Sequence, residues 1–383
     1  MHRVLNSINP TYQNQTRARA AAAATTTTTM ASSGMHSGDV LVVGGGLAGL
    51  STALALAQRG AKVMVVSRDG QESASLAAGG MLAPQAERLT AGPYLDLCLQ
   101  SRAMYPEWAA MLEEASGGLT TGFKAAGGFL APAFPGDGVD TWAPPAEAGR
   151  AYRLDGAQMR GMEPALSEAV AGGWWYPDDM QVDARRIHAS LREACVRAGV
   201  SVLEGPEWEV DALVFSSLGG APRVQAARLA DGRQVAFGRV VVANGAWMNR
   251  LLPVPMTPIK GQMLSLRPVG RGTPSPLSRV IFAESCYLIP KADGRLIVGA
   301  TVEPGKWGLE VTASGVHELT SRALRVCPAL GEMEVDETWA GLRPTTPDTL
   351  PVLGRTPWEN LFVAGALRCV ALAWVVVVMV ELS

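Results

Sequence analysis

The regular hydrophobic pattern of the chain begins at Asp39, where an apolar run is followed by glycines and then by a longer apolar stretch. Val40–Val43 is short and continuously apolar, which is typical of a strand buried in a parallel sheet. Leu47–Gln58 is rich in leucine and alanine, which favours a buried helix, and Gly60 ends it. Lys62–Ser67 predicts a second strand. This order predicts a βαβ unit.

Further elements follow from the same reading. Ala184–Ala198 places Ile187, Leu191 and Cys195 on one helical face, and Asp183 is suited to cap that helix. Gly117–Pro145 is rich in glycine, alanine and proline and predicts loops with short strands. Apolar runs between turn residues predict further strands: Val200–Glu204, Ala212–Ser216, Val224–Leu229, Gln234–Phe237, Arg239–Ala243, Tyr287–Pro290 and Arg295–Gly299. The second to fourth of these form a meander that leads into the fifth, and the last two form a hairpin.

Residues 1–38 lack this pattern. They contain no acidic residue, three arginines, and the runs Ala20–Ala24 and Thr25–Thr29. A basic, hydroxyl-rich leader without acids is typical of an organelle transit peptide. A disordered tail of biased composition is the alternative.

Composition narrows the function classes. The 383 residues allow about two domains, and 48% hydrophobic with 18% charged residues is typical of a soluble globular chain. A net charge of −2 gives no electrostatic reason to expect nucleic acid as a partner. The five cysteines contain no C-x-x-C pair and the four histidines are far apart, so we expect neither a disulfide framework nor a metal site.

A glycine motif joins the first strand to the first helix. Gly44, Gly46 and Gly49 form G-x-G-x-x-G. The first glycine permits a tight turn, the second lets the backbone approach a pyrophosphate, and the third lets the helix pack on the strand. The N–H groups near Leu47 and Ala48 are free to bind an anion. The motif predicts a dinucleotide site, and an ordinary tight turn is the alternative.

The second strand departs from the usual dinucleotide pattern. Ser67 and Arg68 stand where an acidic residue would bind a ribose hydroxyl. A serine hydroxyl can also bind ribose, and an arginine can meet a phosphate or stack on adenine. Taken alone, this pair leaves NADP open as an alternative to FAD.

A second small-residue segment lies after that strand and contains Gly79, Gly80 and Met81. Its small side chains allow the backbone to lie along an extended, bulky ligand such as FAD, although an alanine-rich loop would read similarly. Three more motifs follow at wide spacing: Val240–Trp247, Gly299–Gly305 and Trp339–Asp348.

Together these segments resemble the FAD-dependent amino acid oxidase family (D-amino acid oxidase family), and within it the glycine oxidases of thiamine biosynthesis. The matching pieces are DVLVVGGGLAGLSTALALAQRGAKV, AAGGMLAPQAE, YPDDMQVD, RVVVANGAW, KGQMLSL, CYLIPKADGRLIVGATVEPG and WAGLRPTTPD. The resemblance covers Asp39 to about Ala364 and favours FAD, because a serine–arginine pair occurs at this point in that family.

The resemblance implies an α/β fold in which a Rossmann-like FAD-binding domain is joined to a second, mixed-sheet substrate domain. The implied FAD-binding domain is discontinuous and consists of residues 39–100, 178–252 and 336–383. The implied substrate domain consists of residues 101–177 and 253–335.

The resemblance also implies roles for particular residues. The substrate-carboxylate arginine falls on Arg343, and a guanidinium suits that role because it can hold a carboxylate by two parallel bonds. The pocket tyrosine falls on Tyr287, and the contact to adenosine falls on Trp208. The structural alternatives are a turn arginine, a half-buried strand tyrosine and a packing tryptophan.

The implied activity is FAD-dependent oxidation of glycine or another small amino acid, with O2 as acceptor and hydrogen peroxide as product. The imine would hydrolyse to glyoxylate and ammonia or pass to a thiazole synthase. A flavin dehydrogenase or demethylase of N-methyl amino acids is the alternative. With the thiamine role, the leader predicts a chloroplast address; a mitochondrial or cytoplasmic location and a homo-oligomer stay open.

The segment after Ala364 departs from the family. Gly365 and Arg368 keep the glycine and the substrate-binding arginine of a loop whose other motif residues are replaced. The branched run Val375–Val378 disfavours the helix expected there. We therefore expect weak activity or low solubility, and an inactive FAD-binding chain stays open. Leu361–Val380 is also long enough to span a membrane, but its first residues match a buried strand of the family, so we expect no membrane span.

Overall fold

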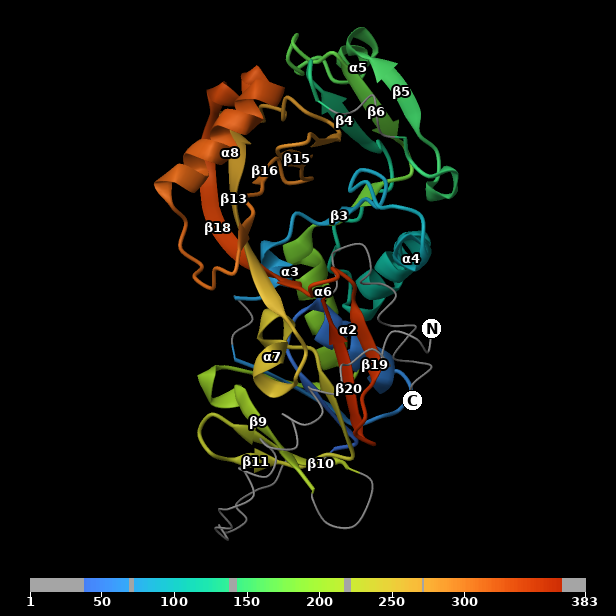
Figure 1. Ribbon diagram of the computed structural model, residues 1–383, viewed down its shortest axis with the longest axis vertical. Helices are drawn as coiled ribbons and strands as arrows, with labels where there is room; N and C mark the ends of the chain where they lie inside the picture. The colour runs from blue at the N-terminus through green and yellow to red at the C-terminus, as the bar shows by residue number, and fades with distance from the viewer. Residues whose placement is uncertain (1–37, 69–71, 138–142, 217–221, 271, 367–383) are drawn as a thin grey trace.

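The computed structural model describes residues 38–68, 72–137, 143–216, 222–270 and 272–366, which form a parallel sheet with helices and a larger mixed sheet beyond it (Figure 1). Most of the leader (1–37), Arg368 and the run Val375–Val378 lie outside these residues. Among the residues described, no helix is both long and apolar enough to cross a membrane.

A six-stranded sheet carries the βαβ unit. Its strands are parallel except β19, which runs antiparallel to its neighbour β20. In spatial order they are β19 (Val352–Arg355), β20 (Leu361–Gly365), β12 (Arg239–Val242), β1 (Val40–Val43), β2 (Val63–Ser67) and β8 (Ser201–Glu204). The predicted βαβ strands and the strands before and after the meander are confirmed within one or two residues at their ends.

Both faces of this sheet are covered, which explains its continuously apolar strands. Val40 and Val42 face a cluster with α2 (Leu47–Ala57), α4 (Pro93–Ala115) and α6 (Ala184–Arg197). Leu41 and Val43 face the opposite cluster. That cluster includes α7 (Met248–Leu251) and the predicted meander, which is the three-stranded sheet β9 (Val210–Phe215), β10 (Val224–Leu229) and β11 (Gln234–Val235).

The second sheet has nine strands and is mixed, because β14 pairs with β4 in parallel while its other pairs are antiparallel. In spatial order its strands are β17 (Glu303–Pro304), β13 (Thr257–Pro268), β16 (Leu296–Gly299), β15 (Tyr287–Pro290), β14 (Val280–Phe282), β4 (Phe129–Ala133), β6 (Gly172–Tyr176) and β5 (Tyr152–Asp155), with β18 (Met333–Thr345) beside β13. The helices α8 (Ala313–Val326) and α5 (Gly156–Met162) pack on one face. The expected α/β architecture and the β15–β16 hairpin are confirmed.

Short elements connect the two sheets. The strands β3 (Met81–Leu82) and β7 (Met180–Gln181) pair with each other, and α3 (Ala74–Ala77) lies near β18. Short 3-10 helices occur at Ala146–Ala148, Pro206–Trp208, Gly245–Trp247 and Pro328–Glu332.

Two expected domain boundaries fall inside regular elements. The boundary between residues 100 and 101 lies within α4, which is continuous from residue 93 to 115. The expected segment 336–383 begins within β18, which pairs with β13 along its length. Residues 336–345 therefore belong to the nine-stranded sheet and not to the parallel one.

Candidate active site

A cavity of about 530 Å³ lies between the carboxyl ends of the parallel strands and the nine-stranded sheet. This edge is where ligands bind in open parallel sheets. Nearly all the site residues predicted from the sequence line this cavity: Gly44, Gly46, Leu47, Ala48, Ser67, Arg68, Gly79, Gly80, Met81, Trp208, Tyr287 and Arg343. Gly49 packs behind the cavity, and Arg368 lies outside the residues described.

The glycine loop has the close contacts that the motif requires. Gly44 has φ +120°, and a Cβ there would lie 2.4 Å from the carbonyl oxygen of Ala243. A Cβ on Gly49 would lie 1.9 Å from the carbonyl oxygen of Gly44, so helix and strand approach only because this residue is glycine. The Leu47 N–H, at the start of α2, donates to Ser75 Oγ at 3.0 Å. The Leu47 N–H is therefore not free, contrary to what the motif predicted, but is bonded to Ser75, whose hydroxyl lies at the predicted pyrophosphate position.

Sequence reasoning missed His188, which holds the same loop from behind. Its Nε2 lies 2.8 Å from the carbonyl oxygen of Gly45, and since a carbonyl only accepts, this nitrogen donates. Burial lowers the pKa of His188 and favours the neutral ring. The available signal was its place next to the buried Ile187 in the predicted helix.

One end of the cavity is lined by Arg68 and by the two tryptophans Trp208 and Trp247. Arg68 forms ion pairs with Glu72 and with Glu209, the latter at 3.8 Å, and lies 5.1 Å from the ring centre of Trp247. An arginine already paired with two carboxylates is poorly suited to a 2′-phosphate, which argues against NADP. Trp208 lines the cavity while Arg233 stacks on its ring at 4.5 Å.

Tyr287 lies at the opposite end, on β15, where two glycines make room for its ring. A Cβ on Gly299 would lie 2.3 Å from Cε2 of Tyr287, and a Cβ on Gly79 would lie 3.2 Å from the same atom. The hydroxyl donates to Met263 Sδ at 3.6 Å, and the ring stacks on Phe282. The tyrosine is therefore fixed at the cavity wall.

Arg343 comes from β18 and lies over β13. A Cβ on Gly261 would lie 2.6 Å from its Nη2, so the guanidinium needs glycine beneath it. Its Nη1 donates to the carbonyl oxygen of Thr301 at 3.3 Å. Among the described residues no ion pair contains Arg343, which lines the cavity, so guanidinium donors other than the one bonded to Thr301 are left for a carboxylate.

A carboxylate behind this wall holds Thr301, and sequence reasoning did not identify it. Glu303 accepts from Gln262 Nε2 at 2.7 Å, Thr301 Oγ1 at 2.8 Å and Lys306 Nζ at 2.9 Å. Burial alone would raise the pKa of Glu303, but these hydrogen bonds outweigh it and lower the pKa to about 2. The carboxylate is therefore ionised at all ordinary pH values.

The residues present fit an extended dinucleotide. The glycine loop offers backbone at one end, and Tyr287 and Arg343 line the other. Asn244 also lines the cavity, and its buried Oδ1 has no hydrogen-bond partner in the described part of the chain. An orphaned buried polar atom at a cavity wall is what a bound polar ligand would satisfy.

The family model DAO, FAD dependent oxidoreductase, matches residues 39–376. The chain belongs to this family. FAD is therefore its cofactor, the NADP alternative is not supported, and the chain is an oxidoreductase that carries its glycine loop, Tyr287 and Arg343 on one cavity.

Several relatives of this FAD dependent oxidoreductase carry names that describe an activity. It is 43% identical over 329 residues to "Bifunctional protein ThiO/ThiG" of Synechocystis sp., covering 85% of this chain and 48% of that protein. It is 34% identical to "Glycine oxidase" of Geobacillus kaustophilus, covering 86% and 88%. The crystal structure of the latter enzyme superposes with a TM-score of 0.81 at 32% identity, covering 91% and 94%. The chain spans about half the length of the ThiO/ThiG relatives that it matches.

Proposed function

We propose that the chain oxidises glycine, or a similarly small amino acid, to the imine, and that O2 is the electron acceptor. The observation that carries this proposal is Arg343, a guanidinium with donors facing the cavity next to the fixed ring of Tyr287. Relatives named glycine oxidase support the same substrate class. Bound FAD would supply the redox chemistry by accepting a hydride from Cα, which carries two electrons, while the amine loses a proton; the two electrons and two protons then pass to O2, which becomes hydrogen peroxide.

The residues of the chain bind and orient the substrate. Arg343 holds the carboxylate by parallel hydrogen bonds, which fixes the position of Cα. Tyr287, Phe282 and Met263 form a largely apolar wall of the same cavity. Exclusion of water by this wall lowers the pKa of the substrate amine, and the neutral amine is the form that is oxidised.

The product and its destination belong to the same proposal. The imine hydrolyses to glyoxylate and ammonia, or reaches a thiazole synthase, a partner suggested by relatives named ThiO/ThiG. We also propose that residues 1–38 direct the chain to the chloroplast, and that the chain assembles as a homo-oligomer.

An anaerobic titration tests the activity. Purified protein should be yellow, and glycine added without O2 should bleach its flavin absorbance; admitting O2 should restore the colour with one peroxide formed per glycine. Sarcosine in place of glycine separates an oxidase of primary amines from a demethylase, and colour that returns only with an artificial acceptor indicates a dehydrogenase. A yellow protein that neither amine bleaches would contradict the proposal.

A further inference from the structure

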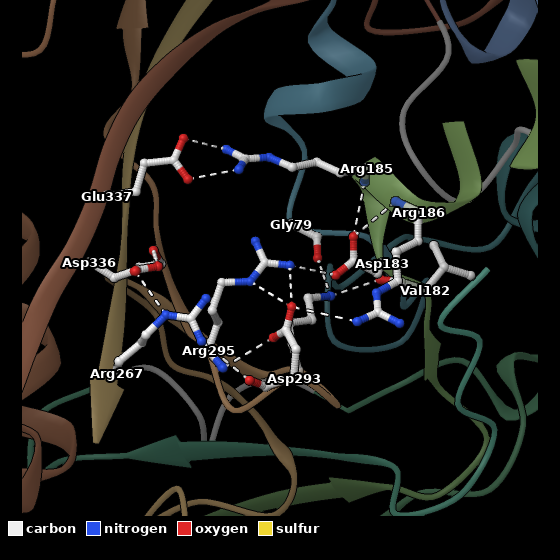
Figure 2. A network of polar contacts seen from close by, with 12 residues as sticks. Gly79, Val182, Asp183, Arg185, Arg186, Arg267, Asp293, Arg295, Asp336 and Glu337 are labelled. Atoms are coloured by element: carbon white, nitrogen blue, oxygen red, sulfur yellow. Dashed lines mark hydrogen bonds and ion pairs between the residues drawn. The ribbon is translucent and has the colours of Figure 1, made fainter. Parts of the chain in front are cut away.

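Lys291 reaches from the β15–β16 hairpin into the base of the cavity wall. Its Nζ donates to the carbonyl oxygens of Val182 at 2.7 Å and Gly79 at 2.9 Å, and to Gln181 Oε1 at 3.3 Å. Figure 2 shows Gly79 and Val182 converging beside Asp183 and Asp293 at this interface. One half-buried ammonium group therefore binds two backbone carbonyls from separate segments.

The segment that Lys291 holds requires glycine at position 80 and is closely packed at position 79. Gly80 has φ +81°, a Cβ there would lie 2.1 Å from the carbonyl oxygen of Val182, and the Val182 N–H donates to Gly80 O at 2.8 Å. A Cβ on Gly79 would lie 2.7 Å from Ile289. The backbone of Gly79–Gly80 is thus pressed between the hairpin and Val182 while it lines the cavity.

The direction of one peptide gives Lys291 a role beyond packing. In a trans peptide the carbonyl and the following N–H point in opposite directions, and the described residues contain a cis bond only at Gly299–Ala300. Because the carbonyl of Gly79 points to Lys291, the N–H of Gly80 points away from Lys291, and Gly80 itself lines the cavity. A cation on the carbonyl polarises the peptide and makes that N–H a stronger donor.

We propose that Lys291 is a positioning residue for the flavin: its ammonium fixes and polarises the Gly79–Gly80 peptide, so that the Gly80 N–H donates strongly to the bound ring and raises its reduction potential. A strengthened donor stabilises the electron-rich reduced flavin more than the oxidised form. The inference depends on the FAD of the family and not on the choice of substrate.

The same interface offers a matched control. Arg295 lies on the same hairpin, and its guanidinium binds Asp183 at 3.0 Å and Asp293 at 2.8 Å (Figure 2). It therefore links the hairpin to Asp183, the residue after the Val182 that Lys291 binds, but its ion pairs do not involve Gly79. If only the docking of the β15–β16 hairpin onto the segment at Val182 and Asp183 mattered, Lys291 and Arg295 would affect the reduction potential of the flavin equally.

The test is the midpoint potential of the bound flavin, measured by photoreduction with a reference dye and without substrate. Lys291→Gln, which keeps a donor but no charge, should reduce the equilibrium constant for two-electron reduction about tenfold, a shift of about −30 mV. Lys291→Arg should recover most of the shift, and Arg295→Gln should stay at the parent potential.

Two results would overturn the proposal: an unchanged potential in Lys291→Gln, or an equal shift in Arg295→Gln. If Lys291→Gln is purified without FAD, the dissociation constant of FAD is compared across the same variants. Weaker binding in Lys291→Gln that Lys291→Arg restores then supports the role, and equal weakening in both Lys291 variants contradicts it. Failure of glycine oxidation would leave these measurements unaffected.

Discussion

The imidazole of His188 donates to the carbonyl oxygen of Gly45 across 143 residues of sequence, at 2.8 Å. This contact joins α6 to the middle of the glycine loop from the side away from the cavity. The loop therefore does not depend on its own turn geometry alone. Its backbone is held in place before any ligand arrives, which reduces the ordering cost of binding.

We expect His188 to make both stability and FAD retention sensitive to acid. Its pKa is lowered from 6.5 in the folded chain, so the unfolded chain takes up a proton first as the pH falls below about 6.5. The free energy of unfolding should therefore decrease from pH 7 to pH 5. His188→Gln keeps a donor without titrating, so its thermal midpoint should fall less over this range.

His188→Ala is the companion variant. It removes the donor and leaves a buried carbonyl unsatisfied, which costs about 1–3 kcal/mol in the free energy of unfolding. Weaker FAD binding should accompany this loss at pH 8, where the histidine is neutral in both states. Identical pH profiles in the parent and His188→Gln would show that other groups cause the acid sensitivity.

Gly46→Val should abolish retention of FAD. A Cβ at this position would lie 3.2 Å from Ser75 Oγ and 3.3 Å from Ser73 Oγ, so branched side-chain atoms would fill the space predicted for the pyrophosphate. The measurement is the ratio of flavin to protein absorbance after gel filtration. Gly161→Ala, in α5 where a Cβ would meet nothing within 4 Å, is the control and should keep a normal ratio. Yellow Gly46→Val protein would contradict the assignment.

The local sequence pattern predicted those strands and helices whose ends are marked by turn residues or by a capping side chain. Val40–Val43 and the meander strands were evident because apolar runs end at glycine or aspartate turns, and Asp183 does cap α6 by accepting from two backbone N–H groups. The long pair of β13 and β18 was not predicted, because it joins residues between 65 (Pro268 and Met333) and 88 (Thr257 and Thr345) positions apart, which leaves no trace in a local window.

The site residues also divide into those that a short motif identifies and those whose role depends on the folded structure. Gly46 and Arg343 could be identified because short motifs contain them, and the cavity brings them together. Glu303 and Lys291 lie inside the motifs of the family resemblance but carry no signal of their own, since Glu303 acts on the Thr301 hydroxyl and Lys291 on the Gly79 carbonyl, and the fold decides both contacts. A side chain whose role is to hold another segment of the chain in place shows no characteristic spacing in the sequence.

Arg343→Leu should reduce kcat/KM for glycine while FAD stays bound. Loss of one partner of a buried charge pair costs roughly 2–5 kcal/mol, which corresponds to roughly 30-fold to several thousandfold. Arg343→Lys keeps a charge but not the two parallel bonds, so its loss should be intermediate. Steady-state peroxide production gives the rates, and unchanged kinetics in Arg343→Leu would make this arginine structural.

The leader can be tested apart from the enzyme. Residues 1–38 fused to a fluorescent reporter should direct it to chloroplasts, because the segment is basic, rich in hydroxyl groups and free of acids. A fusion in which Arg3, Arg17 and Arg19 are changed to glutamate is the control and should stay outside. Mitochondrial or cytosolic fluorescence of the unchanged fusion would contradict the chloroplast proposal.

Glu303 should influence substrate binding through Arg343. Its carboxylate holds the Thr301 hydroxyl, and the carbonyl of the same residue accepts from Arg343. Glu303→Gln removes the charge that keeps this network in place, so Arg343 loses a fixed partner. We expect KM for glycine to rise about 3- to 10-fold, roughly 0.7–1.4 kcal/mol, while kcat changes less because the reacting carbon still meets the same cavity wall.

The pH profile and one exposed neighbour separate this role from general destabilisation. Since the lowered pKa of Glu303 is about 2, the contribution of its carboxylate is present above its ordinary value of 4.5 and is lost only as the pH approaches 2. KM of the parent should therefore show no inflection near pH 4.5. Lys306→Met removes an ion pair whose lysine is 62% exposed, so it should change KM little. A KM in Lys306→Met as high as in Glu303→Gln would assign the effect to the surface pair instead of the Thr301 contact.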